Sequence, residues 1–309
     1  MPYSARMQQN HLYSVYFAPR GRTRMSDLGM QIAQQYLSPF DKLIGIVGEA
    51  GSGKSMLVKG MFPGLELTND DEGVNIRPLP ILTQDSGAFY SPHTYHIDIR
   101  FESAFTQMWQ LKDAILEAIN AGKRVVVEHF DLIYPLLGVN AHLLIGVGSE
   151  IIITRPNMFG PEPQDIAESV FHTIHDRKMV HSAEDLCGHI LESHGISRFS
   201  HRDVKHGFIL VFDTKPDVNL IELEKEIKAA IEKDLPISYV DDKNISIGDD
   251  IYHCTGPRMH IGSTGEIENF ALLHEFTQDP ITKEYYLVGV VGSKGELHAN
   301  DLNRIHIEV

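Results

Sequence analysis

One glycine-rich stretch has the residue types needed to hold phosphate groups. It reads Gly48-Glu-Ala-Gly-Ser-Gly-Lys-Ser55 and satisfies the eight-residue phosphate-binding loop (P-loop) pattern in full. Glycines let the backbone turn so that successive N–H groups face one phosphate, Lys54 neutralises phosphate oxygens, and the Ser55 hydroxyl can hold Mg²⁺. An apolar run precedes the stretch and a plausible helix follows it, which disfavours a chance match. We expect ATP or GTP to bind with Mg²⁺ at Gly48, Glu49, Ala50, Gly51, Ser52, Gly53, Lys54 and Ser55.

Nucleotide chemistry also needs a carboxylate beside the magnesium ion and a group that orients the attacking atom. The candidates are Asp98, Glu128 and Asp131. Glu128 directly follows an apolar run, and a carboxylate at the carboxyl end of a central strand lies beside such a loop, so this residue is favoured. Asp98 and Asp131 are equally well explained as solvated acids in loops. We predict catalytic roles for Lys54, Glu128 and Asp98.

The elements around this stretch indicate an α/β domain with a mainly parallel sheet. The pattern predicts helices over residues 26–36, with Ser26 or Asp27 as N-cap, and 106–121, and strands over 43–47, 80–83, 124–127, 143–147 and 151–154. Strands that alternate with helices favour parallel pairing through crossovers. We assign residues 26–170 to this P-loop domain and residues 1–25 to an N-terminal arm. The basic residues Arg20, Arg22 and Arg24 are expected to be solvated on that arm.

The second half has a different pattern, typical of an α+β domain with a largely antiparallel sheet. It predicts helices over 183–194 and 220–232 and strands over 208–212, 237–240, 251–254, 270–276, 286–291 and 305–308. The sequence Gly160-Pro-Glu-Pro interrupts the preceding pattern and places the boundary near residues 160–178. We assign residues 171–309 to this second domain.

The composition is that of an ordinary soluble protein with excess negative charge. The 309 residues are 42 % hydrophobic and 22 % charged, and no apolar run reaches the ~20 residues that span a bilayer. The N-terminal segment lacks the features of a secretory signal, and two cysteines fit a reducing cytosol. We therefore expect a cytoplasmic protein without a membrane partner. The net charge of −15, of which −10 falls after residue 177, opposes a broad nucleic-acid surface.

Two motifs in the second half resemble those of a known editing domain. They are His181-Ser-Ala-Glu-Asp-Leu186 and a later stretch in which Cys254 and His260 precede Thr264-Gly-Glu-Ile267. Together they resemble the second additional domain of alanyl-tRNA synthetase, in which His-x-x-x-His is followed by Cys-x-x-x-His and then Thr-Gly-Glu-Ile. This chain has Asp185 in place of the second histidine, and five residues instead of three between Cys254 and His260. The resemblance implies hydrolysis of an ester that joins a wrong amino acid to tRNA, with Zn²⁺ orienting the substrate or water.

The residue types of these motifs are themselves suited to a metal ion. His181 and Asp185 are spaced i, i+4, so both can face one ion from a helix. Cys254 and His260 would complete a nitrogen, oxygen and sulfur set of the kind that binds Zn²⁺. The alternative is a buried cysteine with hydrogen-bonded histidines, since the chain has 17 histidines. Further candidates without a spacing argument are Glu184, His189, His201 and His206.

The first half resembles the small ATPase of the tRNA threonylcarbamoyladenosine pathway. That family combines a glycine-rich loop with a Ser-Pro-Thr segment, a His-x-Asp-x-Tyr-Arg motif and a strand that ends in Glu-Trp. The matching positions here are Ser91-Pro92, His96-Ile-Asp98-Ile-Arg100 and Glu128-His129, without the threonine, the tyrosine and the tryptophan. A P-loop kinase fits nearly as well.

Both halves thus resemble proteins that act on tRNA. We predict an ATP-binding P-loop NTPase coupled to an aminoacyl-tRNA editing-like domain, acting in tRNA or amino-acid metabolism. The alternatives are a small-molecule kinase with a ligand- or metal-sensing second domain, and a binding module with a degenerate metal site. The expected partners are a nucleotide and either tRNA or an aminoacyl or other small-molecule substrate, and the negative charge after residue 177 favours the small ligand.

Overall fold

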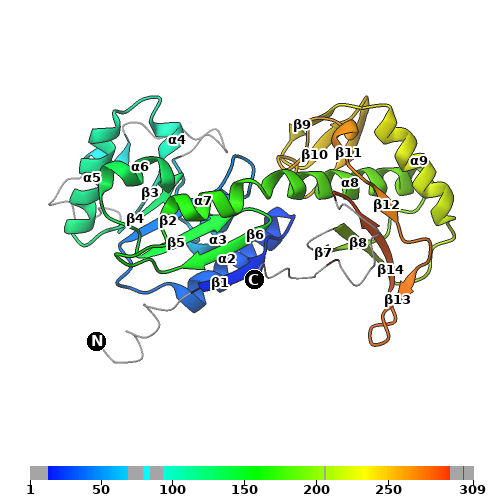
Figure 1. The fold of residues 1–309 in the computed structure, drawn as a ribbon, viewed down its shortest axis with the longest axis horizontal. Coiled ribbons are helices and arrows are strands. Elements are labelled where there is room, and N and C mark those ends of the chain that lie inside the picture. The colour runs from blue at the N-terminus through cyan, green and yellow to red at the C-terminus, as the bar shows by residue number, and fades with distance from the viewer. Residues whose placement is uncertain (1–12, 69–78, 84–92, 205–206, 293–301, 303–309) are drawn as a thin grey trace. The chain divides into compact units, whose positions relative to one another are not determined.

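The chain divides into two compact units. A computed structural model describes residues 13–68, 79–83, 93–204, 207–292 and 302. The first unit consists of residues 1–18 and 22–173, and the second consists of residues 19–21 and 174–309. Figure 1 shows the helices and strands of each. Three N-terminal residues therefore belong to the second unit, although they lie between segments of the first.

The first unit contains a six-stranded mixed sheet in the order β1-β6-β5-β2-β4-β3. Its strands are β1 (Tyr13–Phe17), β2 (Leu43–Val47), β3 (Thr94–Asp98), β4 (Arg124–Glu128), β5 (Leu143–Val147) and β6 (Glu150–Thr154). The predicted parallel pairing holds for β2 with β4, β2 with β5 and β3 with β4. It is wrong for β6, which runs antiparallel to both β5 and β1. Only residues 148 and 149 separate β5 from β6, and such a short connection forms a hairpin instead of a crossover.

Helices cover both faces of this sheet. They are α2 (Arg22–Tyr36), α3 (Lys54–Met61), α4 (Ile99–Glu102), α5 (Met108–Asn120), α6 (Phe130–Leu137) and α7 (Pro163–Phe171). Side chains of β4 alternate between the two cores: Val126 packs with residues of α2 and α3, whereas Val125 and Val127 pack with residues of α5, α6 and α7. This alternation explains why β4 is apolar on both sides.

Two predicted elements of the first unit differ in the structure. Helix α2 begins at Arg22 instead of Ser26, because buried Met25 belongs to the core and draws the preceding turn into the helix. Residues Pro80–Thr83 form a 3₁₀ turn instead of a strand, closed by a hydrogen bond from the Leu82 N–H to the Leu79 carbonyl. Proline has no N–H to give to a sheet, which favours the turn.

Close contact between α2 and α3 fixes the position of the helix that follows the glycine-rich stretch. A side chain at Gly60 would collide with the Ser26 carbonyl, and one at Gly29 would collide with the Leu57 carbonyl. Both glycines therefore allow the two helix backbones to approach each other, which places α3 firmly on the sheet.

In its described part, the second unit combines two helices with two antiparallel sheets. Its helices are α8 (Ile174–Ser193) and α9 (Leu220–Glu232), followed by a 3₁₀ turn, η3 (Thr264–Glu266). One sheet has the order β12-β14-β8-β7, with β13 paired to β14, and the other has the order β11-β10-β9. The strands are β7 (Ser200–Val204), β8 (Gly207–Phe212), β9 (Ile237–Asp241), β10 (Asn244–Ile247), β11 (Asp250–His253), β12 (Ala271–Leu272), β13 (Thr277–Gln278) and β14 (Tyr285–Val290). The predicted combination of helices with an antiparallel sheet is confirmed.

Helix α8 is longer than predicted, because it begins at Ile174 instead of Ala183. Its buried residues include Arg177, His181, Ser182 and Asp185, and these polar side chains break the apolar periodicity from which a helix is recognised. The predicted strand 270–276 contributes only Ala271–Leu272, and residues 305–308 lie outside the described part of the chain. Among the described residues, no helix is both long enough and apolar enough to cross a membrane.

Candidate functional sites

The glycine-rich stretch begins directly after β2 and ends in the first turn of α3. Gly51 and Gly53 have positive φ values of 80° and 93°, a conformation that glycine adopts without strain. A side chain at Gly48 would lie 2.6 Å from the Val147 carbonyl oxygen, so this position has no room for one. Lys54 is buried, and its Nζ donates to the Glu49 carbonyl at 2.8 Å. The lysine therefore lies over the loop itself, where a phosphate group would meet it.

Glu128 lies at the carboxyl end of β4 and faces the first turn of α3. Its Oε2 accepts a hydrogen bond from the Ser55 hydroxyl at 3.3 Å. The strand register aligns Glu128 with Ile46 of β2 and with Asp98 of β3. The structure thus places the predicted carboxylate beside the predicted magnesium-binding hydroxyl.

A histidine that the sequence analysis gave no role holds the other oxygen of Glu128. His96 Nε2 lies 3.0 Å from Glu128 Oε1, and the Thr68 N–H donates to His96 Nδ1 at 3.1 Å. Because Nδ1 accepts, the ring proton of the neutral imidazole is on Nε2 and is donated to Glu128. Only the motif that contains His96 was visible in the sequence; its partner Thr68 lies 28 residues away.

The environment of Glu128 favours its charged form. Burial alone would raise the pKa of this carboxyl, but the hydrogen bond from His96, the charge of Lys54 and the Ser55 hydroxyl together lower it below its ordinary value. Glu128 is therefore an anion at neutral pH, the form that can take part in a magnesium shell.

Asp98 and Asp131 are not the solvated loop acids that the sequence also allowed. Asp98 is the N-cap of α4, and its Oδ1 accepts from the Phe101 N–H at 3.1 Å. Asp131 is buried in the first turn of α6, and within the described residues its Oδ1 has no hydrogen-bond partner. Burial raises the pKa of both carboxyls, helped for Asp98 by the charge of Glu128.

The turn between Glu128 and α6 is strained. His129 has a φ of 55°, a left-handed conformation that is uncommon outside glycine, and it is the N-cap of α6. Burial, followed by the charge of Lys54, lowers the pKa of His129 to about 4, so its ring is neutral at physiological pH. This turn directs α6 back over the sheet immediately after Glu128, and strain of this kind is concentrated at functional sites.

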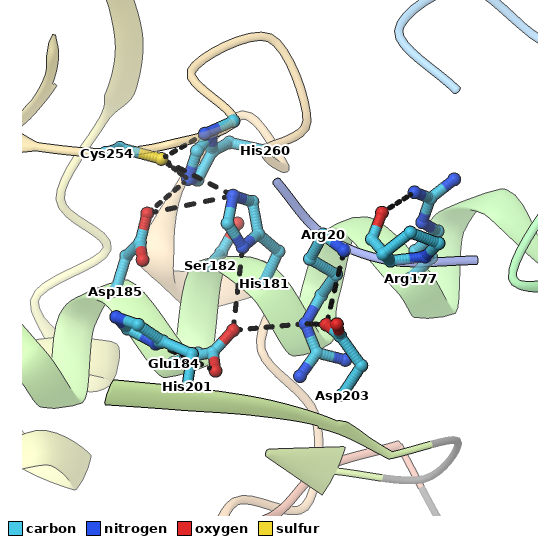
Figure 2. Close-up of polar contacts among 12 residues, drawn as sticks. Arg20, Arg177, His181, Ser182, Glu184, Asp185, His201, Asp203, Cys254 and His260 are labelled. Atoms are coloured by element: carbon cyan, nitrogen blue, oxygen red, sulfur yellow. Dashed lines mark hydrogen bonds and ion pairs between the residues drawn. The ribbon is translucent and has the colours of Figure 1, made fainter. Parts of the chain in front are cut away.

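A second cluster forms in the second unit (Figure 2). His181 and Asp185 lie one turn apart on α8, Cys254 directly follows β11, and His260 lies in the loop after it. Cys254 Sγ is 3.4 Å from His181 Nε2 and 3.8 Å from His260 Nε2. Asp185 Oδ2 is 3.0 Å from His260 Nε2 and 3.8 Å from His181 Nε2. The structure therefore brings all four predicted metal ligands together.

The spacing of these donor atoms fits a single tetrahedral ion. The four ligand atoms all lie within 4.8 Å of one another. Zinc bonds of about 2.0–2.3 Å place the corners of a tetrahedron roughly 3.3–3.7 Å apart, and the four separations given above, 3.0–3.8 Å, lie near this range. The two departures from the editing-domain motif therefore do not keep the ligand atoms apart. Asp185 reaches His260 and His181, and the longer segment after Cys254 brings His260 back to the cluster.

The hydrogen bonds of the cluster also leave a place for a cation. His260 Nδ1 lies 3.2 Å from the Pro257 carbonyl oxygen, which assigns the ring proton to Nδ1. The lone pair of Nε2 then faces the Asp185 carboxylate, so two acceptors meet at 3.0 Å. Burial, with the charge of His181, lowers the pKa of His260 and opposes a second proton on the ring. A metal ion would satisfy both acceptors.

The loop after β11 also fixes the sulfur atom of Cys254. The Gly256 N–H donates to Cys254 Sγ at 3.2 Å, and a side chain at Gly256 would lie 3.0 Å from His181 Nε2. Burial and the nearby charge of Asp185 raise the pKa of the Cys254 thiol, so a cation is needed to obtain the thiolate that binds zinc. Carboxylate, imidazoles and thiol together form a donor set that suits Zn²⁺.

No protein-family model and no curated protein matches this chain. The two resemblances inferred from motifs therefore stay predictions. Of the motif positions, Ser91 and Pro92 lie outside the described residues.

The Thr-Gly-Glu-Ile motif holds the loop that carries His260. The Thr264 hydroxyl donates to the Ala230 carbonyl and accepts from the Leu235 N–H, each at 2.8 Å. Glu266 Oε1 accepts from the N–H groups of Gly262 and Ser263 at 2.9 and 3.1 Å. Within this structure the motif supports the loop, and it contributes no donor atom to the four-residue cluster.

The buried Thr264 hydroxyl gives a test of this supporting role. We expect Thr264→Val to lower the free energy of unfolding by about 1–3 kcal/mol, because it leaves two backbone groups without their partner. Thr277 is an exposed threonine of the same unit, and Thr277→Val should change the value by less than about 0.5 kcal/mol. Urea denaturation of the three proteins measures the difference; equal effects of the two substitutions would contradict the assignment.

The remaining candidates surround the cluster or lie apart from it. Glu184 is buried and accepts from His201 Nδ1 at 3.1 Å and from Arg20 Nε at 3.0 Å. Arg20 was expected to be solvated, but its side chain is only 4 % exposed, because this ion pair draws it into the second unit. His189 faces Asp250 at 3.4 Å and is not part of the cluster, and His206 lies outside the described residues.

Proposed function

We propose that the first unit binds ATP or GTP with Mg²⁺ and transfers or hydrolyses the terminal phosphoryl group. One observation carries this proposal: the Ser55 hydroxyl and the Glu128 carboxylate meet at 3.3 Å beside a glycine-rich loop of left-handed turns. A hydroxyl and a carboxylate from these two positions are what a nucleotide-bound magnesium ion requires. The ion would stabilise the charge that develops on the phosphate oxygens.

Each residue of the site has a distinct task in this proposal. The backbone N–H groups of the loop and the first turn of α3 bind the phosphate chain. Lys54 neutralises charge on its oxygens, and Ser55 and Glu128 hold the ion. His96 keeps Glu128 oriented and ionised through its hydrogen bond.

The acceptor of the phosphoryl group is water in a hydrolase and a hydroxyl in a kinase. Asp131 suits either acceptor, since water and a hydroxyl both have an O–H group that could donate to its buried Oδ1, which lacks a hydrogen-bond donor among the described residues. Asp131 lies in the first turn of α6, which begins two residues after Glu128. A small-molecule kinase therefore remains the second candidate function, and release of inorganic phosphate without an added acceptor would exclude it as the sole activity.

We propose further that the second unit binds Zn²⁺ through His181, Asp185, Cys254 and His260. The convergence of two imidazoles, one thiol and one carboxylate supports this ion over magnesium, which prefers oxygen ligands. The resemblance to the editing domain suggests hydrolysis of an aminoacyl ester, with the zinc ion polarising the carbonyl group or its attacking water. The acidic surroundings favour a small aminoacyl ligand over an extended tRNA contact.

The test of the nucleotide proposal separates binding from turnover. Calorimetry with ATP and with GTP should show binding that needs Mg²⁺ and disappears when EDTA is added. Glu128→Gln should lower phosphate release by roughly 100-fold or more while affinity changes by less than about tenfold, because the carboxylate acts mainly in the transition state. Glu117 is exposed on α5, and Glu117→Gln is the matched control. Unchanged turnover in Glu128→Gln would move the role to Asp98 or Asp131.

A further inference from the structure

Arg20 reaches the second unit from a part of the chain that precedes almost all of the first unit. Its Nε donates to Glu184 Oε2 at 3.0 Å, its Nη1 donates to the Val204 carbonyl at 3.3 Å, and its N–H donates to Asp203 Oδ1 at 3.2 Å. Figure 2 shows Arg20 between Glu184 and Asp203, beside the α8 turn that carries His181. The arginine is therefore built into this unit by both its backbone and its side chain.

Glu184 connects Arg20 to the candidate zinc ligand His181. Glu184 Oε2, the oxygen that accepts from Arg20, lies 3.7 Å from His181 Nδ1. The opposite nitrogen of that ring, Nε2, faces Cys254. Within the described residues, His181 Nδ1 is buried without a hydrogen-bond partner. The only carboxylate beside it in the described structure is thus the one that Arg20 holds.

The charge state of Glu184 is fixed by its partners. Arg20 Nε lies 3.0 Å from Glu184 Oε2, and His201 Nδ1 lies 3.1 Å from Glu184 Oε1. The guanidinium charge and these hydrogen bonds favour the carboxylate anion. An anion beside Nδ1 makes Nε2 a stronger metal ligand, because the Nδ1 proton is drawn toward the carboxylate and the electron pair on Nε2 becomes more basic. This is the arrangement that orients histidine ligands in metal sites.

We propose that Glu184 and Arg20 are positioning residues for the cation site, with Glu184 orienting the His181 ring and Arg20 holding Glu184 in place. This inference rests on the proposed zinc site. It adds that the metal affinity of the second unit depends on an arginine that lies 164 residues from its partner Glu184 in the sequence. Neither residue contacts the ion; both act through His181.

Glu184→Gln is the decisive variant, because it removes the charge and retains the shape of the side chain. Metal affinity is measured on the full-length protein by competition for Co²⁺ and Zn²⁺ with a chromophoric chelator. We expect Glu184→Gln to weaken binding by roughly 10- to 100-fold and to shift the visible spectrum of bound Co²⁺, which reports the ligand field of His181. Arg20→Lys keeps the positive charge but loses the Nε donor, and it should shift both readouts in the same direction by a smaller amount.

Asp203→Asn is the matched control. Asp203 also accepts from Arg20, but the carboxylate that lies beside His181 Nδ1 is that of Glu184. Asp203→Asn should therefore leave the Co²⁺ spectrum and the metal affinity unchanged. If Asp203→Asn and Glu184→Gln weaken metal binding equally, the network of Arg20, Glu184 and Asp203 only packs the unit, and the inference is wrong.

The outcomes separate this inference from the zinc proposal. If the unaltered protein binds neither Co²⁺ nor Zn²⁺, the zinc proposal fails and the positioning role fails with it. If the unaltered protein binds Co²⁺ and folded Glu184→Gln binds it with the same affinity and spectrum, only the positioning role is wrong. Circular dichroism establishes that each variant is folded before its affinity is compared.

Discussion

Lys54→Ala is expected to weaken Mg²⁺-dependent ATP or GTP binding by roughly 10- to 150-fold, which corresponds to about 1.5–3 kcal/mol for hydrogen bonds to a charged group. The side chain is buried, and its ammonium group lies against the Glu49 carbonyl within the glycine-rich loop. A phosphate chain bound there would meet this charge at close range and largely screened from water. Titration calorimetry with each nucleotide measures the loss.

The same helix provides the control for this result. Lys59 lies in the last turn of α3, so Lys59→Ala removes an equal charge at the opposite end of the helix from the loop. We expect nucleotide affinity close to that of the unaltered protein. Equal affinities of Lys54→Ala and the unaltered protein would contradict the nucleotide site itself.

Cys254→Ser should remove zinc from the second unit. Unaltered protein is expected to contain about one equivalent, held by a thiolate, two imidazoles and a carboxylate. Serine keeps the shape of the side chain but is not a thiolate, and Cys254 Sγ is the only sulfur in the described cluster. Because zinc binding contributes directly to folding free energy, the variant should also lose the increase in melting temperature that added zinc gives the unaltered protein.

The other cysteine provides the comparison for this variant. Cys187 is buried in the apolar core of the second unit and is not part of the cluster. Cys187→Ala should therefore retain the metal, as measured by elemental analysis of both purified variants. Less than about a tenth of an equivalent in unaltered protein grown with added zinc would contradict the metal proposal, given the full occupancy that such a donor set supports. An aminoacyl-ester hydrolysis assay on the same samples tests whether any activity depends on the ion.

Features that depend on local sequence could be predicted. The Gly48–Ser55 stretch itself contains the glycines that allow the turn and the lysine that could neutralise a phosphate group. Its pattern therefore indicated both the loop and the helix that follows. Glu128 was identified because it ends an apolar strand, and the structure aligns it with the neighbouring strand ends. His181 and Asp185 were paired by their helical spacing and by the resemblance to the editing-domain motif.

Features that depend on distant contacts could not be predicted. His96 holds Glu128 across neighbouring strands, and Thr68 holds His96 from a loop, so neither contact has a spacing rule. Arg20 was misassigned because a basic residue on a presumed arm is usually solvated, and only the fold brings Glu184 to it. Buried Arg177, His181 and Ser182 concealed the first turns of α8, since they interrupt the apolar periodicity from which a helix is recognised.

Residues 19–21 belong to the second unit but are synthesised before nearly all of the first. Arg20 is made early, but Glu184 follows 164 residues later, and at about 5–20 residues per second that interval is roughly 8–30 s on the ribosome. The whole of α2 through α7 is translated within this interval, so the first unit can form while Arg20 still lacks its carboxylate. Arg20 therefore has no Glu184 carboxylate to pair with until α8 leaves the ribosome. The second unit is completed only when α8 binds a segment of chain that was synthesised long before α8 itself.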